Sequence, residues 1–180
     1  GESAQALLAR GADANATDEN GKSVLMYAAE NGDGKLVKAL LQRKVDVNAA
    51  NKFGETALIN AAWRGRKSVA NTLLDRGAEI DLPDLEGGTA LIWAAINGHT
   101  EVLDLLVERH ADINWVDNSG LTALSRAAWN GEKEAVESLL EHGADSLVRD
   151  KEGMTAAIRA ESEGYSDIVS LLSRSARGDG

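Results

Sequence analysis

The sequence predicts an all-α solenoid, a row of helix–turn–helix units joined by short β-turn fingers. The main observation is a period of 33 residues, since Asp18, Asn51, Asp84, Asp117 and Asp150 each stand three positions before a glycine. Self-similarity at this period is typical of stacked units that share one continuous core. A second observation is that each period holds two short apolar stretches separated by a glycine. A stack of this kind presents a long surface, which favours binding over catalysis.

Composition agrees with one folded domain. The chain has 180 residues, of which 43% are hydrophobic, and it has no cysteine. The absence of cysteine excludes a disulfide framework and thiolate metal sites, and it fits an intracellular location in the cytoplasm or nucleus. No apolar run reaches the roughly 18 residues of a membrane helix, so we expect no membrane insertion. The chain begins in the middle of a unit without a signal peptide, so we expect the natural chain to continue upstream.

The unit 84–116 shows how each element is predicted. Residues 84–87 form a polar turn, in which the acidic side chain can accept backbone hydrogen bonds. Thr89 then precedes an apolar stretch over 90–95, about two turns of a first helix. Gly98 ends that helix, because glycine adopts the left-handed conformation without a Cβ penalty. A second helix over 100–107 has a single apolar face.

The same plan divides the whole chain. The predicted units are a half repeat at 1–17, full repeats at 18–50, 51–83, 84–116 and 117–149, and a C-terminal capping repeat at 150–174. The last unit has Glu161 and Ser173 where the others have apolar residues, as expected where nothing packs beyond it. Together, 1–174 form a single domain, and 175–180 are expected to be a disordered tail.

These motifs resemble the ankyrin repeat family. That family combines a D-x-x-G turn, a T-P-L-H-x-A-A first helix, a G-H-x-E bridge and a V-x-x-L-L second helix. Here Thr89-Ala90-Leu91 matches the first helix, and the bridge is complete only at Gly98-His99-Thr100-Glu101. No unit keeps the Pro or His of T-P-L-H. Lys44 and His110 replace the glycine that follows the second helix elsewhere, and a left-handed conformation there costs ~1 kcal/mol relative to glycine.

The resemblance implies a protein-binding surface on the concave face. In the family, the variable positions of the turn and first helix face the inside of the curve. On these positions the predicted partner-binding residues are Tyr27, Phe53, Trp63, Arg64, Trp93, Ile96, Leu121, Arg126, Trp129 and Arg159. Five of the seven aromatic residues lie there, and contiguous exposed apolar residues mark partner sites. The competing interpretation is that some pack against the next turn, with Trp93 the strongest case.

Charge narrows the class of partner. The net charge is −10, and the concave positions are nearly neutral, so the acidic excess lies elsewhere. A nucleic acid or an anionic membrane surface needs a basic stripe that the sequence lacks. We therefore expect a peptide or protein with an apolar anchor and acidic groups for Arg64, Arg126 and Arg159. We expect the domain to be monomeric.

The sequence gives little support for a catalytic site or a metal site. Acid–base catalysis needs two carboxylates in different environments, whereas the repeated Asp residues share one environment and predict turn caps. The three histidines would have to converge with another ligand to bind a metal, so we expect no metal and no cofactor. His99 is expected to bridge neighbouring units. The tripeptide 177–179, Arg-Gly-Asp, matches an integrin-recognition motif and is interpreted as chance.

Three alternatives to a self-contained binding module remain. The chain could be a targeting or regulatory module of a larger enzyme or channel. It could be an enzyme in its own right, although no nucleophile–base or metal constellation is present. It could also be a modification substrate, because Leu40/Asn48 and Leu106/Asn114 match the family's asparagine-hydroxylation pattern.

Overall fold

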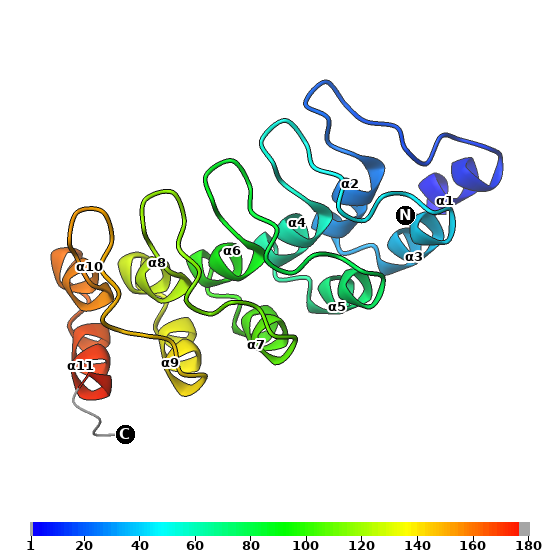
Figure 1. Ribbon diagram of the computed structural model, residues 1–180. Helices are drawn as coiled ribbons and strands as arrows, with labels where there is room; N and C mark the ends of the chain where they lie inside the picture. Colours follow the sequence, from blue (N-terminus) through cyan, green and yellow to red (C-terminus); the bar gives the residue numbers. More distant parts are fainter. Residues whose placement is uncertain (1, 177–180) are drawn as a thin grey trace.

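The computed structural model describes residues 2–176, and within them the chain forms eleven helices and no sheet (Figure 1). The first helix, α1 (Glu2–Ala9), is followed by five pairs of helices. The pairs are α2 (Val24–Asn31) and α3 (Gly34–Gln42), α4 (Ala57–Trp63) and α5 (Lys67–Asp75), α6 (Ala90–Ile96) and α7 (Thr100–Glu108), α8 (Ala123–Asn130) and α9 (Lys133–Glu141), and α10 (Ala156–Ser162) and α11 (Ser166–Ser175).

The helices form two parallel rows. The first helices of the pairs, α2, α4, α6, α8 and α10, pack one against the next and are called inner helices below. The second helices, α3, α5, α7, α9 and α11, form the outer row. Long loops connect each outer helix to the next inner helix and project as a series of fingers on one side of the stack (Figure 1). This arrangement is the helical solenoid that the period predicts.

Local chemistry fixes where the inner helices begin and end. Thr56, Thr89, Thr122 and Thr155 each accept a hydrogen bond on the side-chain oxygen from the backbone N–H three residues later. That bond satisfies one of the N–H groups that a helix N-terminus leaves free. At the other end, Gly32 and Gly131 adopt positive φ of 74° and 78°. Glycine is the residue that this left-handed conformation favours.

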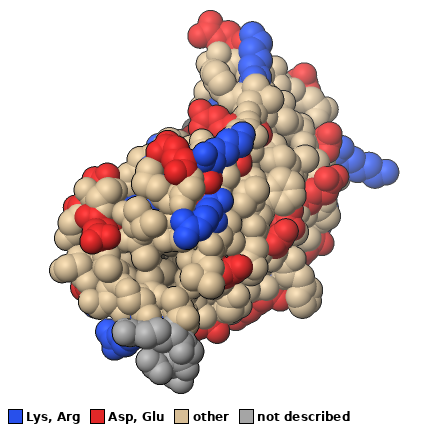
Figure 2. All heavy atoms as spheres, turned by 60° about the vertical axis from the view of Figure 1, so that its left-hand side comes forward, with Lys and Arg blue, Asp and Glu red and all other residues tan. Residues whose placement is uncertain are grey.

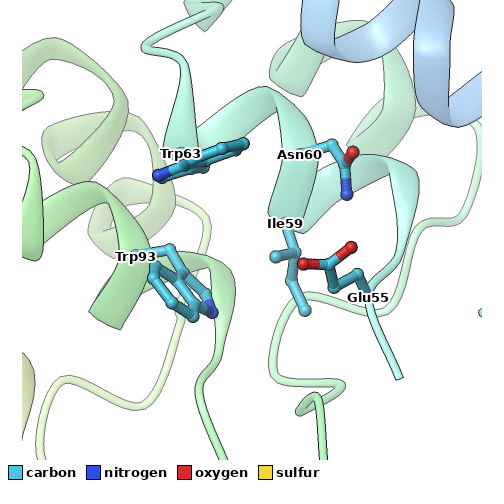
Figure 3. Close-up of a pocket in the computed structure, with 5 residues that line it drawn as sticks. All are labelled: Glu55, Ile59, Asn60, Trp63 and Trp93. Atoms are coloured by element: carbon cyan, nitrogen blue, oxygen red, sulfur yellow. The ribbon is translucent and has the colours of Figure 1, made fainter. Parts of the chain in front are cut away.

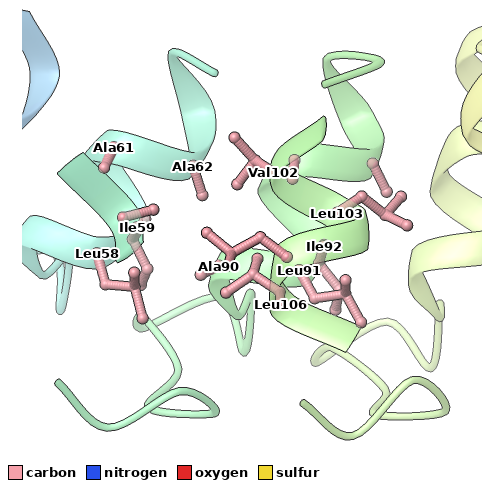
Figure 4. Packing of buried hydrophobic residues seen from close by; sticks show 14 of the residues in the cluster. Leu58, Ile59, Ala61, Ala62, Ala90, Leu91, Ile92, Val102, Leu103 and Leu106 are labelled. Carbon is pink, nitrogen blue, oxygen red and sulfur yellow. The ribbon is translucent and has the colours of Figure 1, made fainter. Parts of the chain in front are cut away.

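Small and branched apolar side chains fill the space between the rows. Alanine pairs such as Ala61-Ala62 are completely buried, so the inner helices can approach closely. Leu103 and Leu106 of α7 are also completely buried, and they pack with Leu91 of α6 in the core that Figure 4 shows. The core therefore runs as one continuous layer from α1 to α11.

Two features at helix ends follow or correct the sequence predictions. Lys44 and His110 have positive φ of 58° and 68°, so the expected left-handed conformation is confirmed at both. Helix α11 continues to Ser175, so the boundary predicted at 174 falls inside the helix. Residues 177–180 of the predicted tail, including the tripeptide 177–179, lie outside the described residues. Over residues 2–176, no helix combines the length and the apolar character needed to cross a bilayer.

Candidate functional site

The Asp or Asn residue that opens each finger turn caps its own loop. Oδ1 of Asp84 accepts hydrogen bonds from the backbone N–H groups of Glu86 at 2.9 Å and Gly88 at 2.8 Å. The corresponding side chains of the four other turns make the same two bonds. The repeated Asp residues are thus turn caps, which confirms that interpretation of the sequence.

The second carboxylate oxygen receives a side chain from the inner helix of the same unit. Tyr27 Oη donates to Asp18 Oδ2 at 2.8 Å, and Trp93 Nε1 donates to Asp84 Oδ2 at 2.7 Å. Arg126 and Arg159 donate in the same way to Asp117 and Asp150, each through Nε at 2.8 Å. Four of the predicted binding residues are therefore oriented by the turn of their own unit.

The unit 51–83 departs from this pattern because it has asparagine at both positions. Asn51 Nδ2 donates to Glu55 Oε2 at 2.6 Å, and Asn60 Nδ2 donates to the Thr56 carbonyl at 3.0 Å. Asn60 is 2% exposed, and its Oδ1 has no hydrogen-bond partner among the described residues. This unit is the place where the link between turn and helix is missing.

Neighbouring units are also joined at the bridge between helices. The His99 Nε2 atom lies 3.0 Å from the backbone carbonyl of Trp63, one unit earlier. The bond links the start of α7 to the end of α4. The expected bridging role of His99 is confirmed.

The comparison with family models identifies this architecture. The model described as ankyrin repeats (3 copies) matches residues 1–84 and 79–150. The chain belongs to the ankyrin-repeat family. Ankyrin repeats are in general protein–protein interaction modules, and a search among curated proteins gives no match for this chain.

Two predicted binding residues of this ankyrin domain are buried. Leu121 is 1% exposed. Its backbone N–H and carbonyl both bond to Asp117, so the turn directs its side chain inward. Arg159 is 7% exposed and pairs with Asp150 at 2.6 Å and Glu152 at 3.2 Å. The expectation that Leu121 and Arg159 lie on an open surface is wrong.

The other arginines predicted to meet acidic partner groups already have acidic neighbours. Arg64 pairs with Glu30 at 2.8 Å, and Glu30 also pairs with Lys22 at 2.6 Å. These bonds, first that from Lys22 and then that from Arg64, hold the pKa of Glu30 below its ordinary value. Arg126 pairs with Asp117, whose side chain is 3% exposed. Arg64 and Arg126 are therefore each paired with a carboxylate of the chain itself.

Exposed apolar side chains gather on the fingers and the adjoining inner helices. We call this surface the finger face and define it by the exposed Tyr27, Phe53, Trp63, Leu85 and Val116 together with Glu55, Glu86, Trp93, Ile96 and Trp129. Phe53 and Leu85 are the most open, at 56% and 69%. Trp63 is 37% exposed, whereas Trp93 is half-buried.

A small pocket opens on the finger face between two tryptophans. Its volume is about 80 Å³, and it is lined by Glu55, Ile59, Asn60, Trp63 and Trp93. Figure 3 shows the two indoles approaching from α4 and α6, with Ile59 and the Glu55 carboxylate on the far side of the gap. The amide nitrogen of Asn60 faces Glu55 in the same view. The pocket thus combines aromatic walls with one carboxylate.

A second hollow of about 250 Å³ adjoins this pocket. It is lined by Phe53, Glu55, Asp84, Leu85, Glu86 and Trp93. Glu55 and Trp93 line both spaces, so they join them into one surface feature. The sequence interpretation did not select Glu55 or Glu86. The available signal was that position five of the unit holds Lys22, Gly88, Leu121 or Met154 elsewhere, so a carboxylate occurs there only once.

Trp129 occupies a different setting from Trp63, although both stand at position thirteen of their units. Trp129 is half-buried, and its Nε1 donates to Glu163 Oε1 in the next unit at 3.0 Å. The Arg159 and Arg126 guanidinium carbons lie 4.5 and 5.7 Å from its ring centre. The substantial exposure expected for both tryptophans is therefore found only at Trp63. Ile96 is partly buried against the core.

The charged side chains of the described residues are mixed in sign. On the part of the face that Figure 2 draws in colour, Lys and Arg are interspersed with Asp and Glu and form no continuous basic stripe. A basic stripe is what nucleic-acid binding requires. Within residues 2–176, no group of three or more His, Asp and Glu side chains is placed to hold a metal ion.

Proposed function

We propose that this chain is a non-catalytic recognition module that binds a peptide or protein partner on the finger face. The observation that carries the proposal is the row of exposed Phe53, Trp63 and Leu85 beside the pocket between Trp63 and Trp93. Aromatic side chains at the centre of an interface supply most of its binding free energy. We further propose that the matched ankyrin copies continue to residue 175 as five units preceded by a half unit, which the five helix pairs support.

We propose that the partner-binding centre lies on the units 51–116. Phe53, Trp63, Trp93 and Ile96 stay in this assignment, and Tyr27, Arg64, Arg126 and Trp129 lie at its margins. Leu121 and Arg159 are removed because they are buried. Truncation of Trp63 is the clearest test, since the hydrogen bond to His99 uses only its backbone carbonyl and survives the change.

The test is a selection of binding peptides from a displayed random library against the immobilised domain. We expect Trp63→Ala to weaken the selected peptides roughly thirtyfold, since hot-spot aromatics contribute about 2 kcal/mol. Glu108→Gln is the matched control, because Glu108 is exposed on the outer helix α7. Equal binding by Trp63→Ala and the original domain, with loss on Glu108→Gln, would place recognition on the outer row instead.

A further inference from the structure

Among residues 2–176, three of the five aromatic rings of the finger face have a cation of the chain itself beside them, whereas the rings of Phe53 and Trp93 do not. Lys22 Nζ lies 4.9 Å from the Tyr27 ring centre, and the Arg64 guanidinium lies 4.2 Å from that of Trp63. Trp129 lies beside two arginines in the same way. Trp93 has no such neighbour among residues 2–176. Cations are attracted to the negative face of an aromatic ring, most strongly to tryptophan.

The Trp93 ring lines the same pocket as the carboxylate of Glu55. Glu55 accepts one bond from Asn51 on Oε2, which fixes its orientation, and it has no basic partner among the described residues. Glu86, on the rim of the adjoining hollow, also lacks one there. Lys52 is exposed on the same finger, but it lines neither space. The pocket therefore has negative and aromatic groups and no cation.

In the preceding unit, 18–50, an aromatic ring and a carboxylate hold a lysine side chain. There, the Lys22 ammonium lies over the Tyr27 ring and bonds to Glu30 Oε2 at 2.6 Å. Lys22 stands at position five of its unit, and Glu55 stands at the same position one unit later. At the pocket, Glu55 therefore stands where the lysine would be, and the aromatic rings come from Trp63 of the same unit and Trp93 of the next.

We propose that the pocket between Trp63 and Trp93 receives a lysine or arginine side chain of a polypeptide partner, with its cationic group directed at Glu55. This inference rests on the proposed function and replaces the acidic partner groups that the sequence suggested. Arg64 does not oppose the cation, because it covers the Trp63 ring without lining the pocket and is paired with Glu30. The aliphatic stem of the partner side chain lies against Ile59 and the indoles, while apolar neighbours contact Phe53 and Leu85.

The first experiment uses small cations and needs no partner. The probes are n-butylammonium and n-butylguanidinium chloride, with n-butanol at equal ionic strength as the neutral control. The readout is the set of tryptophan indole N–H signals in a nitrogen-15 correlation spectrum. We expect saturable shifts of the Trp63 and Trp93 signals with a dissociation constant on the order of 10 mM. Trp115, whose Nε1 bonds to the Gly87 carbonyl outside the pocket, serves as the internal reference.

Two variants show whether the carboxylate is responsible. Glu55→Gln keeps the size of the side chain and should weaken cation binding about threefold, as expected for a partly exposed ion pair. Glu108→Gln removes a distant charge and should leave it unchanged. Absence of saturable shifts at Trp63 and Trp93, equal shifts with n-butanol, or insensitivity to Glu55→Gln would each overturn the proposal.

Selected peptides separate this proposal from the proposed function. Replacement of a peptide's lysine or arginine by norleucine should weaken binding to the original domain and have little further effect on Glu55→Gln. Peptides that depend on Trp63 but tolerate both changes would overturn the cationic anchor and leave recognition by the finger face intact. Peptides indifferent to Trp63→Ala would contradict the proposed function itself.

Discussion

At the scale of single residues, one polar position per unit joins neighbouring finger stems, the name used here for the segments that follow the outer helices. Asn48 and Asn114 each accept, on Oδ1, the backbone N–H of the next stem, at Glu79 and Asp145, both at 2.9 Å. The equivalent residue between them is Asp81, which accepts the Asp112 N–H at 3.1 Å and 3.2 Å. Burial and the nearby charge of Asp112 raise the pKa of Asp81, although the Asp112 hydrogen bond lowers it.

Asp81→Asn should therefore stabilise the domain slightly at neutral pH. Asparagine keeps the acceptor and removes a charged form that the folded state disfavours. A raised folded pKa means that this cost is present above the folded pKa and fades as pH falls and protonates the group. The variant's advantage in melting temperature should thus be present at pH 7 and vanish below about pH 4. An advantage that grows on acidification would contradict the assignment.

The left-handed residues give a second residue-scale prediction. His110 is exposed and has φ 68°, so His110→Gly removes a conformational cost of ~1 kcal/mol, partly offset by the greater freedom of glycine in the unfolded chain. We expect the free energy of unfolding, from denaturant titration, to rise or stay unchanged. Gly77→Ala is the converse control at the equivalent position, with φ 87° and open space around the added Cβ, and should cost about 1 kcal/mol. A loss of more than 1 kcal/mol in His110→Gly would reveal a contact of its side chain.

Some of the hydrogen bonds around the fingers could be predicted from the sequence, and others could not. The turn caps and the His99 bridge were predictable, because they depend on residue type and spacing alone. The bonds from Tyr27 and Trp93 to the turn carboxylates were not, because nine residues separate the partners and only the folded direction of each side chain brings them together. Leu121 was misplaced for the same reason, since Lys22, Glu55 and Met154 at the equivalent position are half-buried and Leu121 is buried.

At the scale of elements, a buried ion pair joins helix α10 to the finger turn that precedes it. The side chains of Asp150 and Arg159 are 1% and 9% exposed. Burial by itself would raise the pKa of Asp150, but the Arg159 hydrogen bond and two backbone N–H groups lower it below its ordinary value. The pair of Arg64 and Glu30, near the other end, is more open, with side chains 47% and 17% exposed.

Arg159→Met should accordingly destabilise the domain far more than Arg64→Met. Removing one partner of a buried pair leaves an uncompensated charge and costs about 3 kcal/mol, whereas an exposed pair contributes ~1 kcal/mol or less. Thermal unfolding and hydrogen exchange of α10 would measure the difference. Adding Asp150→Asn to Arg159→Met should restore part of the loss, as unit 51–83 tolerates asparagine at both positions. Equal losses from the two single variants would contradict the role of burial.

At the scale of the whole molecule, each helix pair packs mainly against its immediate neighbours. The inner helix α6 contacts α4, α8 and its own partner α7. The stability of such a stack is approximately a sum over units and their interfaces. The 33-residue period was sufficient to predict this architecture, because it repeats one local structure. It could not predict that the Trp93 ring has no cation beside it among residues 2–176, since the pocket is formed by side chains from two neighbouring units.

The position of a defect along the stack should therefore decide how far it spreads. Leu106 in the central α7 and Leu172 in the terminal α11 are 0% and 1% exposed, so truncation of either to alanine costs about 2–5 kcal/mol locally. Leu172→Ala should accelerate amide hydrogen exchange mainly in 150–176, because within residues 2–176 this unit packs on one neighbouring unit and can open alone. Leu106→Ala should lower protection on both sides of α7, since loss of the central unit removes an interface from each half. Uniform acceleration along the whole chain in both variants would show that the stack unfolds as a single cooperative body.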